Sequence, residues 1–106
     1  MPISITNQNI AQEIHQETQP IILDIFATWC GPCQQMEPVI EELEQEVGSK
    51  YKFAKLNVDE AREISIAYGV TSVPTFIFLH NNQVKGKETG YMDKETLLEK
   101  IEQYLG

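Results

Sequence analysis

The sequence is short of cysteines, of basic residues and of long apolar runs, and each shortage excludes a class of protein. Two cysteines among 106 residues are too few for a small scaffold held together by disulfide bonds. Eight Lys and Arg against sixteen Asp and Glu give a formal net charge of −8. Because phosphate backbones and anionic membrane surfaces are bound through basic clusters, we expect no nucleic-acid partner and no membrane partner. The longest apolar runs, such as Phe76–Leu79, fall far short of the roughly 20 residues that a membrane-spanning helix needs.

The chain also lacks internal repeats, low-complexity tracts and a charged leader followed by an apolar stretch. A hydrophobic content of 42% is ordinary for a globular protein. A length of 106 residues fits one domain, so we expect a single soluble domain over residues 1–106 without a secretion signal.

Strand-like and helix-like patterns alternate along this domain. Apolar, β-branched or alternating segments predict strands at residues 3–5, 21–27, 51–58, 75–79 and 84–89. Apolar residues at helical spacing predict helices at 10–14, from the cysteines to Gly48, at 60–68 and at 97–105. Pro38 should kink the second helix, Asp93 should cap the last, and a turn is expected at 81–82. This order predicts an α/β layer structure with a partly parallel sheet covered on both faces.

The strongest chemical signal is the segment from Trp29 to Cys33, Trp-Cys-Gly-Pro-Cys, between a buried strand and the long helix. In a regular helix, residues three apart have Cβ atoms ~5–6 Å from one another, whereas a relaxed disulfide needs ~3.8 Å. The cysteines can therefore pair only if Cys30 lies at the flexible start of the helix. A bond made under that constraint should be easy to reduce, so the spacing favours a disulfide that opens and closes.

Cys30 is the expected nucleophile of the pair. The thiolate is the attacking species, and Cys30 would face the unpaired N–H groups and the positive dipole end of the helix. That position lowers the thiol pKa by up to roughly 1.5 units. We expect Cys30 to be exposed, and Cys33, one turn into the helix, to be covered and to act as the resolving cysteine.

Three other interpretations of the pair are weaker. Inert cysteines in the core would not need Gly31 and Pro32 between them at a helix start. A purely structural disulfide would close too small a loop to constrain the unfolded chain much. A zinc site needs about four ligands, and His15 and His80 lack ligand spacing, so no metal is expected.

The motif and several distant segments together resemble the thioredoxin family. The matching segments are the strand with Asp24, Trp29–Cys33, Pro38, Lys55–Asp59, Tyr68–Val70, Val73–Thr75 and Gly90. The resemblance covers essentially the whole chain and implies the thioredoxin fold, a central mixed β-sheet of about five strands flanked by about four helices. It also implies a dithiol–disulfide oxidoreductase that reduces protein disulfides and holds no cofactor. The implied partners are disulfide-containing target proteins and a thioredoxin reductase, NADPH- or ferredoxin-dependent, for a cytoplasmic monomer.

The resemblance further implies how the cysteines work and what assists them. Cys30 attacks a target disulfide and forms a mixed disulfide, and Cys33 then attacks Cys30 and releases the reduced target. Burial would raise the pKa of Asp24 toward neutrality, so that it could exchange a proton with Cys33. The residues alone leave open a structural ion pair between Asp24 and Lys55. The resemblance favours the catalytic role for Asp24, with Lys55 as the neighbouring residue that adjusts the pKa of Asp24.

A docking surface around Cys30 is also implied. Only ~5–6% of X–Pro bonds in folded proteins are cis, but the family has a cis bond at the position of Pro74. That bond would leave the backbone of Val73 free to pair with an extended target segment. The expected apolar patch consists of Trp29, Gly31, Pro32, Val73, Pro74 and Gly90. On the residues alone, Trp29 could equally be a core aromatic and Gly90 an ordinary glycine at a strand end.

The sequence departs from the family pattern at a few positions and leaves two other functions open. Gln34 stands where many relatives carry a cation, Phe26 where Trp is frequent, and Asn82 where Gly is common. An oxidase or isomerase is one alternative, although the dipeptide Gly31-Pro32 has no cation to favour the dithiol form. The other alternative is a non-catalytic docking or assembly subunit that uses the same patch.

Overall fold

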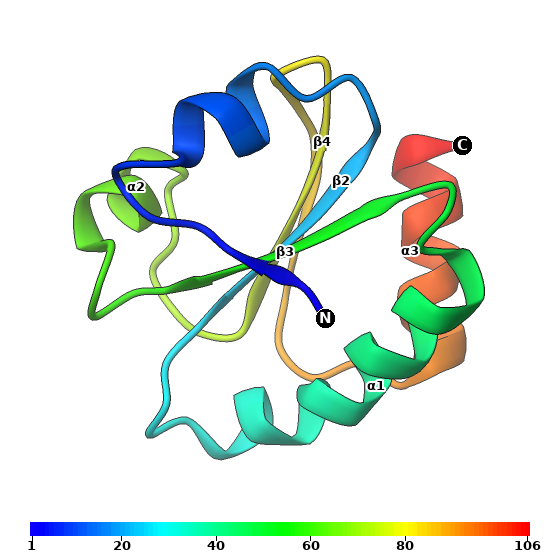
Figure 1. Cartoon of the computed structure of the whole chain (residues 1–106). Coiled ribbons are helices and arrows are strands. Elements are labelled where there is room, and N and C mark those ends of the chain that lie inside the picture. The colour runs from blue at the N-terminus through cyan, green and yellow to red at the C-terminus, as the bar shows by residue number, and fades with distance from the viewer.

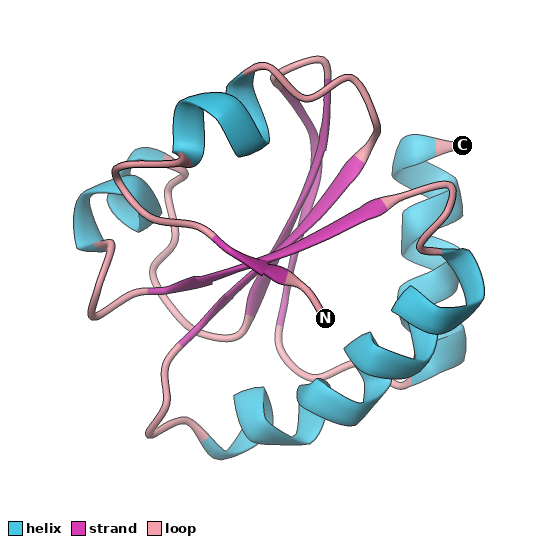
Figure 2. Cartoon of the chain, viewed as in Figure 1, coloured by secondary structure: helices cyan, strands magenta, loops and turns pink.

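The computed structural model describes all residues from 1 to 106 and contains one mixed, five-stranded sheet between two layers of helices (Figures 1 and 2). The strand order is β1-β3-β2-β4-β5. The first three strands in that order are parallel, whereas β4 and β5 are antiparallel to their neighbours. The strands are β1 (Ile3–Ser4), β2 (Ile21–Phe26), β3 (Lys52–Asn57), β4 (Thr75–His80) and β5 (Gln83–Thr89). The apolar run of β2 explains its central place, because such a strand must be covered on both faces.

Four helices cover the sheet, as the sequence pattern predicts. They are η1 (Ala11–His15), α1 (Gly31–Val47), α2 (Arg62–Ala67) and α3 (Lys94–Leu105). Helices α1 and α3 lie on one face of the sheet, and η1 and α2 lie on the other (Figure 1). Alternate residues of β2 reach the two apolar cores, with Ile22 on the α1 and α3 side and Leu23 on the opposite side. None of the helices combines the length and the apolar character needed to cross a membrane.

The predicted elements are confirmed, with differences at their ends. The first helix is a π-helix, in which the Gln16 N–H donates to the Ala11 carbonyl five residues earlier. Helix α2 begins at Arg62 rather than at residue 60, because the backbone N–H groups of residues 60 and 61 both donate to the Asn57 carbonyl. Helix α1 runs without interruption through Pro38.

Local contacts account for the turn and cap residues. Asp93 caps α3 by accepting from the Thr96 N–H at 2.9 Å, as predicted. Asn81 and Asn82 form the β4–β5 turn with φ of 52° and 60°. Gly86 lies in β5 against the ring of Tyr104, where a Cβ would overlap the aromatic carbons. The absence of a side chain at residue 86 therefore lets α3 close over the sheet.

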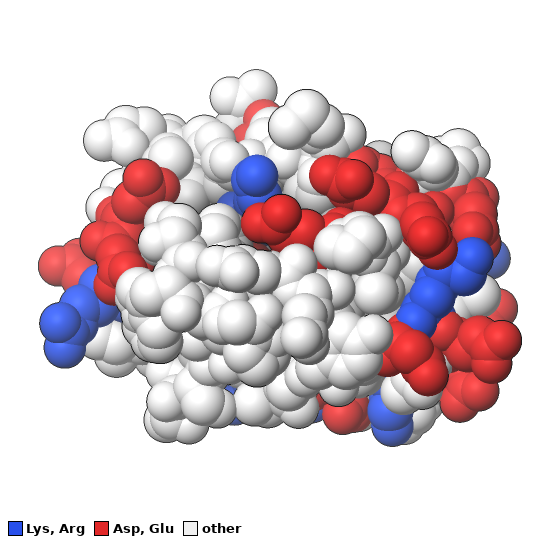
Figure 3. Space-filling model, turned by 90° about the horizontal axis from the view of Figure 1, so that it is seen from below, with Lys and Arg blue, Asp and Glu red and all other residues white.

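This topology brings four segments to one end of the sheet. The end of β2, the N-terminus of α1 and the loops at 70–74 and 89–93 all lie at the bottom of Figure 1. Seen from below, this end presents a broad area without Lys, Arg, Asp or Glu side chains (Figure 3).

Candidate active site

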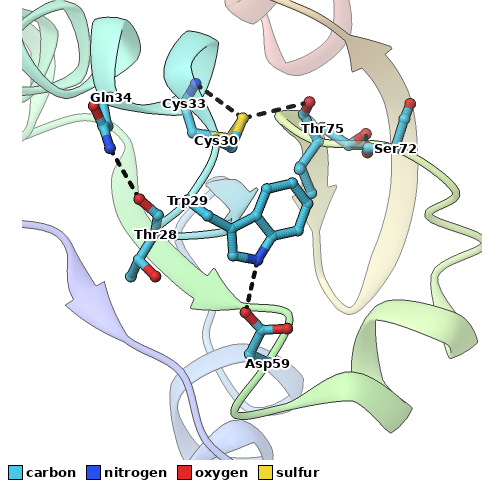
Figure 4. Close-up of a disulfide and its surroundings, with 9 residues drawn as sticks. Thr28, Trp29, Cys30, Cys33, Gln34, Asp59, Ser72 and Thr75 are labelled. Carbon is cyan, nitrogen blue, oxygen red and sulfur yellow. Dashed lines mark hydrogen bonds between the residues drawn. A yellow bond between two sulfur atoms is a disulfide. The ribbon is translucent and has the colours of Figure 1, made fainter.

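Cys30 occupies the N-cap position of α1 and is paired with Cys33. Its backbone is extended, with φ of −91° and ψ of 115°, so it stands just outside the regular helix. The two cysteines form a disulfide with their Cα atoms 5.2 Å apart. The Sγ atom of Cys30 accepts a hydrogen bond from the Cys33 N–H at 3.2 Å (Figure 4). The predicted position of the first cysteine at the helix start is confirmed, and a helix N–H group is aimed at its sulfur.

The expected exposure of Cys30 is wrong. Its exposed fraction is 6%, hardly more than the 4% of Cys33. Cys30 is covered because its Sγ lies 3.7 Å from the carbonyl oxygen of Val73, in a loop distant in sequence. The two cysteines also pack with Ala27 in a small apolar cluster.

Asp24 is buried behind Cys33 and carries an unsatisfied carboxylate oxygen. Its exposed fraction is 8%, and its Oδ1 atom has no hydrogen-bond partner. Burial raises the pKa of Asp24 from 3.8 to about 7; the positive charge of Lys55 opposes this rise and the negative charge of Glu37 adds to it. A carboxyl group with such a pKa can both accept and release a proton at neutral pH.

Lys55 lies beside Asp24 without forming an ion pair with it. The two residues are register partners on β2 and β3, and both line a cavity of about 230 Å³ that also reaches Cys33. No nitrogen of Lys55 comes within 4.0 Å of a carboxylate oxygen. The structural ion pair between Asp24 and Lys55, which the sequence left open, is therefore not formed. Lys55 influences Asp24 only through its positive charge, which lowers the pKa of the carboxyl group.

Trp29 stands on the surface rather than in the core. It is 71% exposed, and its Nε1–H donates to Asp59 Oδ2 at 3.0 Å (Figure 4). No local pattern marks Asp59 as a partner of Trp29, because the two residues lie 30 positions apart in the sequence. Gln34 donates through its side-chain amide to the Thr28 carbonyl at 2.9 Å, which ties the motif to the preceding loop.

The loop opposite Cys30 offers an unpaired stretch of backbone. The bond between Val73 and Pro74 is cis, as the resemblance implies. The N–H and carbonyl groups of Val73 make no hydrogen bond to other backbone groups. Gly90 donates to the Pro74 carbonyl at 2.8 Å, and its φ of 101° with open space beside it leaves room for another chain. Pro74 itself is buried, so the expectation that it adds exposed apolar surface is wrong.

A second cavity, of about 320 Å³, is bordered by Trp29, and no sequence pattern predicts it. Its lining includes Asp59, Arg62, Ile66 and Val73. Ile66 is 61% exposed, and no pattern in the sequence marks it as part of the site, because its place beside Trp29 comes from the packing of α2.

This arrangement defines a thiol–disulfide oxidoreductase. A cysteine pair at a helix N-terminus can exchange a disulfide with another protein, and the buried carboxyl group behind it can hold a proton. The backbone of Val73, next to the sulfur, can accept an extended segment.

Comparisons with known proteins agree with the fold and the site. A family model described as thioredoxin matches residues 1–103. The chain is 38% identical to a thioredoxin of Bacillus subtilis over 103 residues, which is 97% of each protein. It is 35% identical to a thioredoxin of Rickettsia bellii over 101 residues, 95% of this chain and 96% of the relative. It is also 43% identical to an M-type chloroplastic thioredoxin of Spinacia oleracea over 86 residues, 81% of this chain and 48% of that longer protein. The chain belongs to the thioredoxin family.

Proposed function

We propose that this oxidoreductase works as a cytoplasmic, monomeric, single-domain reductant of protein disulfides. The observation that carries the proposal is the Cys30 sulfur, held at the N-terminus of α1 by the Cys33 N–H. Hydrogen bonding and the helix dipole both stabilise a thiolate there once the disulfide is reduced. Gly31 and Pro32 contribute no cation that would favour the dithiol further, so the pair is expected to give electrons rather than take them.

The reaction proceeds through two displacements. The Cys30 thiolate attacks one sulfur of the target disulfide, and the other target sulfur leaves as a thiolate that takes up a proton. Cys33 then loses its proton to Asp24 and attacks Cys30, which breaks the mixed disulfide. The second target thiolate leaves and is protonated. The target gains two electrons, and Cys30 and Cys33 lose two as they form their disulfide.

Target binding is assigned to the uncharged surface around Cys30. Trp29, Gly31 and Pro32 are exposed on one side of the sulfur, and Val73 and Gly90 lie on the other. An extended target segment would pair with the Val73 backbone and pass over Gly90, whose N–H donates to the carbonyl of the buried Pro74. The half-exposed Tyr91 widens this apolar surface.

The cycle closes when a thioredoxin reductase returns two electrons to the Cys30–Cys33 disulfide. The protein is then an electron carrier between that reductase and its targets. The reductase is either NADPH- or ferredoxin-dependent, and a panel of both kinds with the oxidised protein would distinguish them.

Reduction of insulin disulfides by the dithiol form tests the proposal directly. The parent protein should catalyse the reaction, and Cys30→Ser should abolish it. Cys33→Ser should keep the first attack but accumulate a mixed disulfide that mass spectrometry detects. Activity that is independent of Cys30 would leave only a docking role, and a strongly oxidising redox potential would point to an oxidase instead.

A further inference from the structure

Glu37 is an acidic residue next to both cavities that reach Cys33. It lies four residues after Cys33 on α1, so the two side chains share one face of the helix. The cavity of about 230 Å³ is bordered by Asp24, Cys33, Glu37, Glu41 and Lys55 among others. A neighbouring cavity of about 340 Å³ is bordered by Cys33, Gln34 and Glu37. Glu37 is the one acidic residue that borders both, and it is exposed whereas Asp24 is buried.

The carboxyl group of Asp24 is only 8% exposed and borders the cavity of about 230 Å³, so its proton exchanges with the solvent through that cavity. The Oδ1 atom of Asp24 has no hydrogen-bond partner in the protein, although a buried carboxylate normally has one. The cavity in front of it has room for several water molecules, since each occupies ~30 Å³ in the liquid. Water there would connect Asp24 to the acidic groups at the cavity border.

The charges around Asp24 single out Glu37 among its neighbours. Lys55 faces it from β3, and α1 presents Glu37 and, one turn further on, Glu41. Met1 also borders the cavity, but its amino group is paired with Glu44 at 2.8 Å. The residue opposite Asp24 on β4 is Phe76, which carries no charge.

We propose that Glu37 is a positioning residue that carries the proton between Asp24 and the solvent through water in the cavity. This inference rests on the proposed function. In the resolving step the Cys33 thiol gives its proton to the Asp24 carboxylate, and its sulfur displaces the target sulfur from Cys30. The transfer from Cys33 to Asp24 is reversible, and before the new sulfur–sulfur bond forms the proton passes from Asp24 through water to Glu37 and on to the solvent, so that Asp24 cannot return it to Cys33. When the disulfide is reduced again, a proton moves inward along the same path.

The electrostatic interaction between Glu37 and Asp24 favours this proton transfer. The negative charge of Glu37 adds to the effect of burial in raising the pKa of Asp24, while Lys55 opposes it. Because like charges near one another disfavour the ionised form, the negative charge of Glu37 makes Asp24 a better acceptor for the Cys33 proton.

The test follows the resolving step in rapid-mixing experiments. The reduced protein is mixed with one equivalent of 2,2′-dithiodipyridine, an uncharged disulfide whose two leaving groups absorb light when released. The first release reports attack by Cys30 and the second reports resolution by Cys33. Glu37→Gln should slow the second release about fivefold at pH 8, less than the ~10²-fold typical of a group that itself takes the proton. The first release should stay within about twofold of the parent, because Glu37 acts only after the mixed disulfide forms.

Glu41→Gln is the matched control, because it removes the same charge from the same helix one turn further from Cys33. It should change the second release by less than about twofold. In Glu37→Gln the second release should recover as imidazole is raised at constant pH and ionic strength, since the free base can take the proton. The pH at half-maximal second release should also move down, because the negative charge that raises the pKa of Asp24 has gone.

Two kinds of failure can be separated. A parent protein that shows two releases, together with a Glu37→Gln variant that resolves equally fast, overturns the proton path alone. Equal slowing by Glu37→Gln and Glu41→Gln, or slowing that imidazole does not relieve, overturns it as well. A parent protein that releases nothing contradicts the proposed function itself.

Discussion

Replacing Asp24 with Asn should abolish a pH dependence of stability that the buried carboxyl group creates. The pKa of Asp24 is about 7 in the folded protein against an ordinary value of 3.8, so the folded state binds more protons than the unfolded state between these values. Stability therefore falls as the pH rises from about 4 to 7. The shift of about three pKa units corresponds to about 4 kcal/mol in total, at ~1.36 kcal/mol per unit. About 2–3 kcal/mol of this should be lost between pH 5 and pH 8.

Urea unfolding followed by circular dichroism would measure the effect. The oxidised protein is used so that the cysteines do not titrate. The free energy of unfolding of Asp24→Asn minus that of the parent should increase by about 2–3 kcal/mol from pH 5 to pH 8. This increase is expected even if the two proteins already differ in stability at pH 5. Asp59→Asn is the matched control, since it makes the same chemical change at an exposed carboxylate. An offset for Asp24→Asn that does not change with pH would refute the assignment of Asp24 as a buried acid.

Three further outcomes are expected. Asp24→Asn should slow turnover more than it harms folding, and a pH–rate profile that coincides with that of the parent would contradict its role in proton transfer. Trp29→Ala should weaken target binding by about 1–2 kcal/mol, seen as a higher KM in insulin reduction, and leave the free energy of unfolding nearly unchanged, because the side chain is 71% exposed. Gly86→Ala should destabilise the protein by about 1–3 kcal/mol in urea unfolding, because the new methyl group would overlap the Tyr104 ring; a smaller loss would mean that α3 can shift freely.

Much of the fold and the reactive pair could be predicted from local patterns. The apolar run of β2, the caps and turns at Asp93, Asn81 and Asn82, and the start of α1 at the cysteines depend on residues close together in the sequence. Such patterns report backbone preference and burial directly.

Features that depend on distant contacts could not be predicted in this way. Cys30 is covered by the loop at Val73, and Trp29 donates its hydrogen bond to Asp59, two residues after the end of β3. The position of Glu37 beside Asp24 requires the packing of α1 on the sheet. In each case two segments far apart in the sequence meet only once the fold has formed.

The rate at which each thiol of the reduced protein is alkylated at pH 7 tests the central claim most directly. Iodoacetamide labelling followed by mass spectrometry assigns the rate to each cysteine. Cys30 should react at least about tenfold faster than Cys33, because the helix N-terminus holds its sulfur as a thiolate. Two thiols that react equally slowly would contradict the account.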